Sequence, residues 1–327
     1  MTRISMILIL ALMVFCLCSV AAFAQSPPDS AKFGPWSTPI NVGPPLNTQY
    51  NDMYAVLTDD ELTVYFTSDR PGGLGTNDLW VSHRASTDAA WGDPENLAVL
   101  NSPSDDSLAV LSTSGNIMYF HSTRPKGSCG AGDLWTSRRH PHTGAWGAPV
   151  NMGCIVNSTS SDTAPAFYAN DDLGVTTIYF GSNRPGIGDF DIYETTTRDA
   201  DLESAIWTPG LLVPELSSPK RDTRTSVRQD GREIFITSDR DGGQGKIDIW
   251  VATRENNSQL WSTPINPGAP LNSTADDGSP ALSKDGKTLY FFSNRDGGFG
   301  GRDIYFTRRT AFERRQIDRR GAKSPQA

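Results

Sequence analysis

The sequence contains few of the residues from which metal centres and nucleophilic active sites are commonly built. Among its 327 residues there are only four histidines and four cysteines. The histidines, which lack the spacing of zinc ligands, are His83, His121, His140 and His142. Neither a G-x-S-x-G nucleophile elbow nor a Walker phosphate loop occurs. We therefore predict no metal and no cofactor.

The sequence also lacks long stretches with the hydrophobic period of a helix, and most of the chain carries no net positive charge. The formal net charge is −8, and much of the positive charge lies in residues 308–327, where seven Lys and Arg face two Asp and Glu. The chain before this stretch is therefore strongly acidic and should repel nucleic acid and anionic lipid. We expect no nucleic-acid partner. Residues 309–327 are predicted to be a basic, flexible tail.

The N-terminus has the three parts of a secretory signal. Arg3 precedes an apolar run over residues 6–20, and Ala22-Phe23-Ala24 supplies the small residues of a cleavage site. We expect residues 1–24 to be removed after Ala24, leaving a periplasmic or secreted protein without a membrane span. The alternative is an uncleaved membrane anchor, because the run is almost long enough to span a bilayer.

The body of the sequence is an internal repeat. The stretch YFTSDRPGGLGTNDLW at 65–80 recurs with small changes, for example as YFFSNRDGGFGGRDIY at 290–305. Each copy joins an apolar run, an Arg, a glycine-rich loop and an Asp. The repeated arginines are Arg70, Arg124, Arg184, Arg240 and Arg295. The aspartates after the loop are Asp78, Asp133, Asp191, Asp248 and Asp303. Further aspartates precede a short apolar stretch in each copy: Asp52, Asp106, Asp162, Asp222 and Asp277.

Each repeat reads as four short strands separated by turn signals. The second strand is apolar on both faces, as a sheet packed between two others requires. We therefore predict an all-β, five-bladed β-propeller of four-stranded antiparallel blades over residues 25–308. The expected blades are about 52–97, 106–152, 162–213, 222–266 and 277–308. Because the last repeat lacks its own Trp-x-x-Pro strand, the orphan copy at 36–41 is expected to complete that blade and close the ring.

The motif S-[DN]-R, a glycine loop and D-[IL]-[WY], with SKDGKTLYF at 283–291, resembles the TolB-type, WD-like β-propeller repeat family. The resemblance covers about residues 36–308 and is specific for the fold but not for a function. Many propellers of that family have six blades, whereas five repeats are counted here. The N-terminal α/β domain of TolB is absent, so the resemblance does not imply the role of TolB itself.

Five copies of one motif favour a structural role for it. The Arg at the end of the second strand can bridge the Asp at the start of the third strand, and it can also reach the Asp of a first strand. We interpret Arg70 with Asp78, and the four equivalent pairs, as structural ion pairs. The loop glycines permit the tight crossing between the second and third strands.

Two features break the symmetry. Arg224 stands where the other repeats have Tyr54, Leu108, Ala164 and Ser279. It could bind the acid group of a ligand, or it could be an internal counter-ion for Asp162 or Asp277. Separately, Cys129 and Cys154 fall in loops on the same face, and an oxidising compartment would let them form a disulfide.

These observations lead to a functional expectation. We expect a monomeric, non-catalytic binding or scaffolding protein, not an enzyme. Its protein, peptide or glycan ligand would lie on the face that carries Arg224 and the first-strand ring, whose members are Asp52, Asp106, Asp162, Asp222 and Asp277. The alternative is a five-bladed glycoside hydrolase or a sugar-binding lectin, because several such propellers cleave sugars. Equivalent carboxylates argue against that alternative, since glycoside hydrolysis needs an acid and a base with different surroundings.

Overall fold

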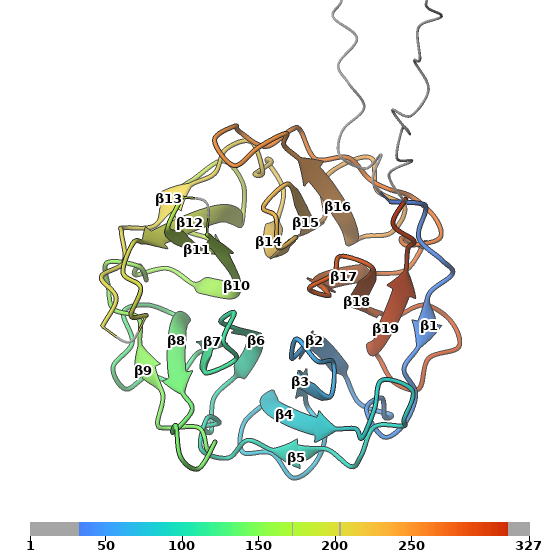
Figure 1. The fold of residues 1–327 in the computed structure, drawn as a ribbon, viewed down its shortest axis with the longest axis horizontal. Coiled ribbons are helices and arrows are strands. Elements are labelled where there is room, and N and C mark those ends of the chain that lie inside the picture. The colour runs from blue at the N-terminus through green and yellow to red at the C-terminus, as the bar shows by residue number, and fades with distance from the viewer. Residues whose placement is uncertain (1–32, 172, 203, 313–327) are drawn as a thin grey trace, which may run out of the picture.

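The computed structural model describes residues 33–171, 173–202 and 204–312. Five antiparallel sheets stand in a ring about a central axis (Figure 1), and the described residues contain no helix. The prediction of an all-β, five-bladed propeller is confirmed. The predicted signal sequence at 1–24 and residues 313–327 of the predicted tail at 309–327 lie outside the described residues. At the start of that tail, Arg309 is buried and pairs with Glu233 of blade 4. No helix within the described ranges is long and apolar enough to cross a membrane.

The blades follow one another in sequence order around the ring. Blade 1 consists of β2 (Asp52–Leu57), β3 (Thr63–Ser68), β4 (Asp78–His83) and β5 (Glu95–Asn96). Blade 2 consists of β6 (Asp106–Leu111), β7 (Ile117–Ser122), β8 (Asp133–Arg138) and β9 (Val150–Asn151). Blade 3 consists of β10 (Asp162–Asn170), β11 (Val175–Ser182), β12 (Asp191–Thr197) and β13 (Leu211–Leu212). Blade 4 consists of β14 (Asp222–Val227), β15 (Glu233–Ser238) and β16 (Asp248–Thr253). Blade 5 consists of β17 (Asp277–Leu282), β18 (Thr288–Ser293), β19 (Asp303–Arg308) and the N-terminal β1 (Ile40–Asn41).

Blade 4 differs from the prediction in its outermost strand. Its sheet has three strands, and the expected fourth is reduced to a single antiparallel bridge between Val251 and Ile265. The other blades keep a two-residue outer strand. The departure is therefore small and lies at the periphery, far from the innermost strands β2, β6, β10, β14 and β17 that surround the axis (Figure 1).

The middle strands form the core because both of their faces are covered by neighbouring blades. In β3, Val64, Tyr65 and Phe66 are all fully buried. Tyr65 and Leu79 of blade 1 pack in one cluster with Met118 and Phe120 of blade 2. Stacking of this kind is the main source of hydrophobic stabilisation in a ring of sheets.

The N-terminal strand closes the ring as predicted. In β1, Ile40 pairs with Phe306 and Asn41 with Tyr305 of β19, in antiparallel register. The buried Asn47 adds a second connection, since its amide nitrogen donates to the carbonyl oxygen of Ile304 and its amide oxygen accepts from the Ile304 N–H, at 2.9 and 2.8 Å. Asn101, Asn157 and Asn272 make the same contact in other blades. Closure thus uses the connection that already joins consecutive blades.

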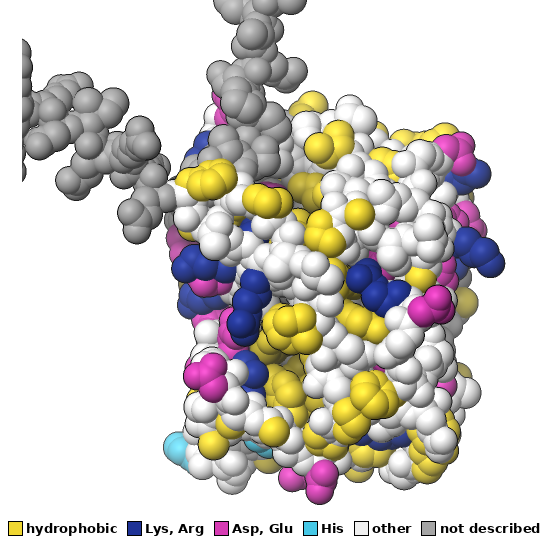
Figure 2. Space-filling view, turned by 90° about the vertical axis from the view of Figure 1, so that its right-hand side faces the viewer, with side chains coloured by type: hydrophobic (Ala, Val, Ile, Leu, Met, Phe, Trp, Pro, Cys, Tyr) yellow, Lys and Arg dark blue, Asp and Glu magenta, His cyan; other side chains and the backbone are white. Residues whose placement is uncertain are grey.

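The outer wall of the ring carries hydrophobic side chains in small groups. Figure 2 shows this wall on the side of β1 and β19, with Lys and Arg lying between the apolar groups. The outermost segments of four blades each expose one large apolar side chain: Ile40, Val150, Leu211 and Ile265. Isolated exposures of this kind are ordinary in soluble proteins.

Replacing Asn47 by Ala should weaken closure. The Ile304 N–H and carbonyl would remain buried without partners, so we expect a loss of about 1–3 kcal/mol in the free energy of unfolding, measured by urea denaturation. Asn256→Ala, at an exposed loop position, is the control and should change stability by no more than about 0.5 kcal/mol. Equal effects of the two changes would contradict a role of Asn47 in closure.

Candidate functional site

A ring of buried ion pairs lies on the face of the propeller where the first strands begin. Each first-strand Asp is inaccessible to solvent and accepts a hydrogen bond from the Arg that ends the second strand of its own blade. The N–O distances are 2.5–2.6 Å. The pairs are Arg70–Asp52, Arg124–Asp106, Arg184–Asp162, Arg240–Asp222 and Arg295–Asp277.

This pairing corrects the predicted partners of the arginines. The third-strand aspartates Asp78, Asp133, Asp191, Asp248 and Asp303 do not receive the guanidinium groups in these ion pairs. Instead, Asp78 accepts backbone N–H groups of the glycine loop, from Leu74 at 2.6 Å and Gly75 at 3.3 Å. A Cβ at Gly73 would lie 1.7 Å from Oδ2 of Asp78, so the loop needs glycine there. The loop turns back onto its own Asp, which leaves the Arg free to reach the first strand.

The same geometry corrects the predicted ligand contacts of Asp52 and its four equivalents. Oδ1 of Asp52 accepts from Arg70 and from the Ser68 hydroxyl, and Oδ2 accepts from the N–H and hydroxyl of Thr48. The carboxylate has no exposed surface. Since both oxygens are already occupied by groups of the protein, this ring has a structural function and offers no open acid to a ligand.

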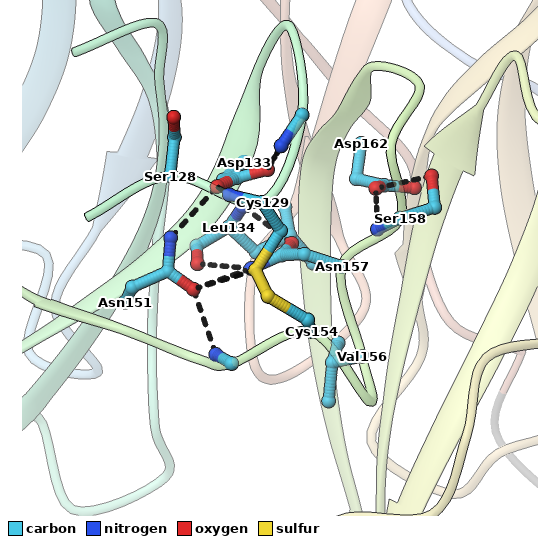
Figure 3. Close-up of a disulfide and its surroundings, with 12 residues drawn as sticks. Ser128, Cys129, Asp133, Leu134, Asn151, Cys154, Val156, Asn157, Ser158 and Asp162 are labelled. Atoms are coloured by element: carbon cyan, nitrogen blue, oxygen red, sulfur yellow. Dashed lines mark hydrogen bonds between the residues drawn. A yellow bond between two sulfur atoms is a disulfide. The ribbon is translucent and has the colours of Figure 1, made fainter. Parts of the chain in front are cut away.

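A disulfide joins blades 2 and 3 on the same face. Cys129 follows β7 in the glycine loop, and Cys154 lies in the connection that leads to β10 (Figure 3). Their Cα atoms are 5.5 Å apart. Beside them, the Asp133 carboxylate accepts from the backbone N–H of Cys129 and from the Asn151 amide (Figure 3). The bridge therefore fastens a loop that hydrogen bonds already hold.

Removing one member of a buried pair should be costly. Arg124→Ala leaves the Asp106 carboxylate buried without its cation, and we expect a loss of about 3–5 kcal/mol in the free energy of unfolding. Lys220→Ala removes the exposed pair with Asp241 and should cost about 0–1 kcal/mol. Guanidinium denaturation of the two variants measures both values. Similar losses in both would contradict a special role for the buried ring.

The opposite end of the channel opens into a cavity of about 450 Å³. Its walls come from the last residues of the innermost strands and from the turns between first and second strands, and all five blades contribute. These strand ends and turns lie at the far end of the first strands from the buried ion pairs, so the pairs do not constrain their side chains. A volume of this size falls in the range of small-ligand sites.

Among the described residues, the acids that line this cavity come from two blades. Blade 1 contributes Asp59, Asp60 and Glu61, and blade 3 contributes Asp171. The corresponding turns of blades 2, 4 and 5 place Thr113, Gln229 and Lys284 on the wall. The carboxylates of the cavity are therefore not equivalent by repeat, unlike those of the buried ring.

Two of the acids in blade 1 already have local partners. Asp60 accepts a hydrogen bond from the Thr58 hydroxyl at 2.6 Å and from the Leu62 N–H at 3.0 Å, and these bonds lower the pKa of its carboxyl group. Asp59 forms an ion pair with Lys284 of blade 5. These contacts shape the turn and link neighbouring blades, which leaves Glu61 and Asp171 as the candidate acids.

Glu61 has an unusual backbone conformation. Its φ is 56°, in the left-handed region, where the turns of the other blades have Gly115, Gly174, Gly231 and Gly286. A non-glycine residue held in that region costs about 1–3 kcal/mol, and such residues cluster at functional sites. Arg84 lies beside Glu61, with its Nη2 3.7 Å from the carboxylate and its guanidinium 4.3 Å from the centre of the Trp91 ring. Burial, with a smaller contribution from Glu61, raises the pKa of the neighbouring Tyr290.

Arg224 lies at the inner end of the same cavity. It is 3% exposed, and its Nη2 donates to the carbonyl oxygen of Ala109 at 3.0 Å. The structure thus brings Arg224 to the cavity and separates it from the five aspartates of the ring, with which sequence analysis had grouped it.

Sequence analysis missed Glu61 and Asp171, although the turns contain the signal. Aligned on the strands, the turns read STSGN, RQDGR and SKDGK in three blades but TDDEL in the first. A glutamate at the glycine position is a break in the repeat of the same kind as Arg224.

In comparisons by sequence, no protein-family model and no curated protein matches the chain. Solved structures do match. A thermostable family-43 glycoside hydrolase has a TM-score of 0.54 at 14% identity, covering 87% of this chain and 97% of that one. The catalytic domain of the Coprinopsis cinerea GH62 α-L-arabinofuranosidase has a TM-score of 0.51 at 12% identity, covering 86% and 98%. TolB from Acinetobacter baumannii has a TM-score of 0.46 at 13% identity, with 80% of this chain covered, and the chain spans 55% of the length of that TolB.

The fold of this chain is therefore that of five-bladed propellers that include glycoside hydrolases. The expectation of a non-catalytic scaffold, and with it the expectation that the chain is not an enzyme, is wrong. It rested on the equivalence of the ring carboxylates, but these are buried and structural. The structural likeness to glycoside hydrolases overturns it, and the inequivalent acids of the cavity remove its physical basis.

Glycine at position 61 should relieve the backbone strain. We expect Glu61→Gly to raise the free energy of unfolding by about 1 kcal/mol. Glu61→Ala is the matched control, because it removes the carboxylate but keeps a side chain at positive φ, and it should bring no such gain. Chemical denaturation of the parent protein, Glu61→Gly and Glu61→Ala shows whether the backbone conformation or the charge of Glu61 lowers stability. An equal gain from Ala would assign the cost to the charge of Glu61 and not to its backbone.

Proposed function

We propose that the chain is an extracytoplasmic glycoside hydrolase whose active site is the cavity at the turn end of the channel. The observation that carries this proposal is the inequivalence of the cavity acids, with Glu61 on blade 1 and Asp171 on blade 3. Glycoside hydrolysis needs two carboxyl groups with different roles on either side of a sugar. A cavity walled by five blades can provide such a pair only if the repeat is broken, as it is here.

The surroundings of the two acids support a division of roles. Glu61 lies next to the Arg84 guanidinium, whereas Asp171 has no ion-pair partner among the described residues. A neighbouring guanidinium can hold a carboxylate in one orientation, as a general base or nucleophile requires. We assign that role to Glu61 and the role of general acid to Asp171.

Two further points agree with a hydrolase that acts on glycans outside the cytoplasm. The structures that match at TM-scores of 0.54 and 0.51 over most of both chains are a family-43 hydrolase and an arabinofuranosidase. The disulfide between Cys129 and Cys154 suits an oxidising compartment. The signal pattern at residues 1–24 points to the same compartment.

The test is a hydrolysis screen of the full chain on plant and bacterial polysaccharides and on aryl glycosides. On any substrate that is cleaved, Glu61→Gln and Asp171→Asn should each reduce kcat by about 10²–10⁴, the usual contribution of an acid–base group. Asp241→Asn is the control, because Asp241 is an exposed acid that pairs with Lys220 and does not line the cavity.

Circular dichroism and thermal unfolding of each variant should show an intact fold, so that lost activity reports on chemistry. Absence of hydrolysis on the whole panel would refute the proposed function. So would hydrolysis that persists unchanged in both Glu61→Gln and Asp171→Asn.

A further inference from the structure

Arg224 spans the central channel. It belongs to β14 of blade 4, yet its Nη2 bonds to Ala109 in β6 of blade 2, with blade 3 lying between these two along the ring (Figure 1). It also stands only two positions after its ring aspartate, Asp222. In each of the other first strands, the first residue that lines the cavity comes three or four positions after the ring aspartate. These residues are Val56, Val110, Pro165 and Pro280. Arg224 therefore forms the floor of the cavity.

The guanidinium has no counter-ion among the described residues. Its Nε and Nη1 atoms are buried without a hydrogen-bond partner. Sequence analysis named Asp162 and Asp277 as alternative counter-ions of Arg224. Each of them instead forms an ion pair with an arginine of its own blade. Burial lowers the pKa of Arg224 to about 10, and the neighbour that opposes this shift is a phenol, Tyr54, and not a carboxylate. Arg224 is thus not the internal counter-ion of the ring.

A buried cation without a partner is costly, and proteins rarely keep one without a ligand. The cost is easily avoided here, because the equivalent positions carry Tyr54, Leu108, Ala164 and Ser279. Arg224 is one of the residues that line the cavity of about 450 Å³, so an anionic group that enters from the open end can approach its guanidinium. Guanidinium recognises a carboxylate strongly through charge-assisted hydrogen bonds.

We propose that Arg224 binds the carboxylate of an acidic sugar, so that the substrate is a glycan containing a uronic acid. The inference rests on the proposed hydrolase function and specifies its substrate class. Glu61 and Asp171 lie at the turn end of the cavity, and Arg224 lies at its floor. A uronic acid bound with its carboxylate on Arg224 therefore extends its glycosidic bond toward the two acids.

The first test compares an acidic oligosaccharide with its carboxyl-reduced form, which has the same linkages but no charge. The full chain should cleave the acidic form with a kcat/KM about 10- to 100-fold higher, as one charged hydrogen bond contributes. Arg224→Met should abolish this preference by raising KM for the acidic form, so that the variant cleaves both forms with similar kcat/KM. Arg224→Lys, which keeps the charge, should retain part of the preference.

Unfolding measurements distinguish a ligand-binding role of Arg224 from a purely structural one. Arg224→Met replaces a stranded charge by an apolar side chain, so its melting temperature should equal or exceed that of the parent protein. Sodium glucuronate should raise the melting temperature of the parent but not of Arg224→Met, whereas glucose should act on neither. A lowered melting temperature in Arg224→Met, with an unchanged substrate preference, would overturn the proposal.

Two outcomes separate this inference from the proposed function. Equal cleavage of acidic and reduced glycans by the parent and by Arg224→Met would overturn the role of Arg224 and leave the hydrolase standing. Binding of glucuronate that needs Arg224, without hydrolysis of any glycan, would support the anion site and refute the hydrolase. Stabilisation by chloride or phosphate as large as that by glucuronate would show a general anion site and overturn the assignment to a sugar.

Discussion

The structure depends on one interaction made five times, in which a buried Asp at the head of a first strand binds the Arg at the end of the second. Around Asp52 the interaction joins three segments, because Thr48, Ser68 and Arg70 all donate to the same carboxylate. Arg70 also donates to the carbonyl oxygen of Leu46, which packs with Ile304 of the preceding blade. A pair of this kind adds little net stability over apolar packing, but it holds strands and neighbouring blades in one register.

Because of this constraint, the two ends of the channel differ in how freely their residues can change without loss of the fold. At the end of the ion pairs, every blade needs the same Asp, Arg, Ser and glycine loop, and the disulfide at Cys129 fastens one loop further. At the other end, the turns between first and second strands need only to reverse the chain. Their residues can change without loss of the fold, so the acids of blades 1 and 3 and the Lys of blade 5 can differ. Function is expected at the end that the repeat leaves free.

The repeat made the fold predictable, including its blade count and its closure by residues 36–41, because each motif marks one blade and the missing outer strand marks the seam. The partners of Arg70 were not predictable, since the choice between Asp52 and Asp78 depends on how the glycine loop folds back. The candidate site was also misplaced. A regular motif draws attention to residues that recur, whereas Glu61 becomes visible only when each turn is compared with the other four.

Glu61 and Arg224 together give the strongest argument for the location of the site. Glu61 occupies a backbone conformation for which four other blades use glycine, and Arg224 is a buried cation where four other blades use uncharged residues. Each is unfavourable for folding, and each could be removed by copying a neighbouring blade. Both nevertheless line the same cavity, on different blades. Two independent costs at residues that line one cavity support the proposal of a single ligand that uses both groups.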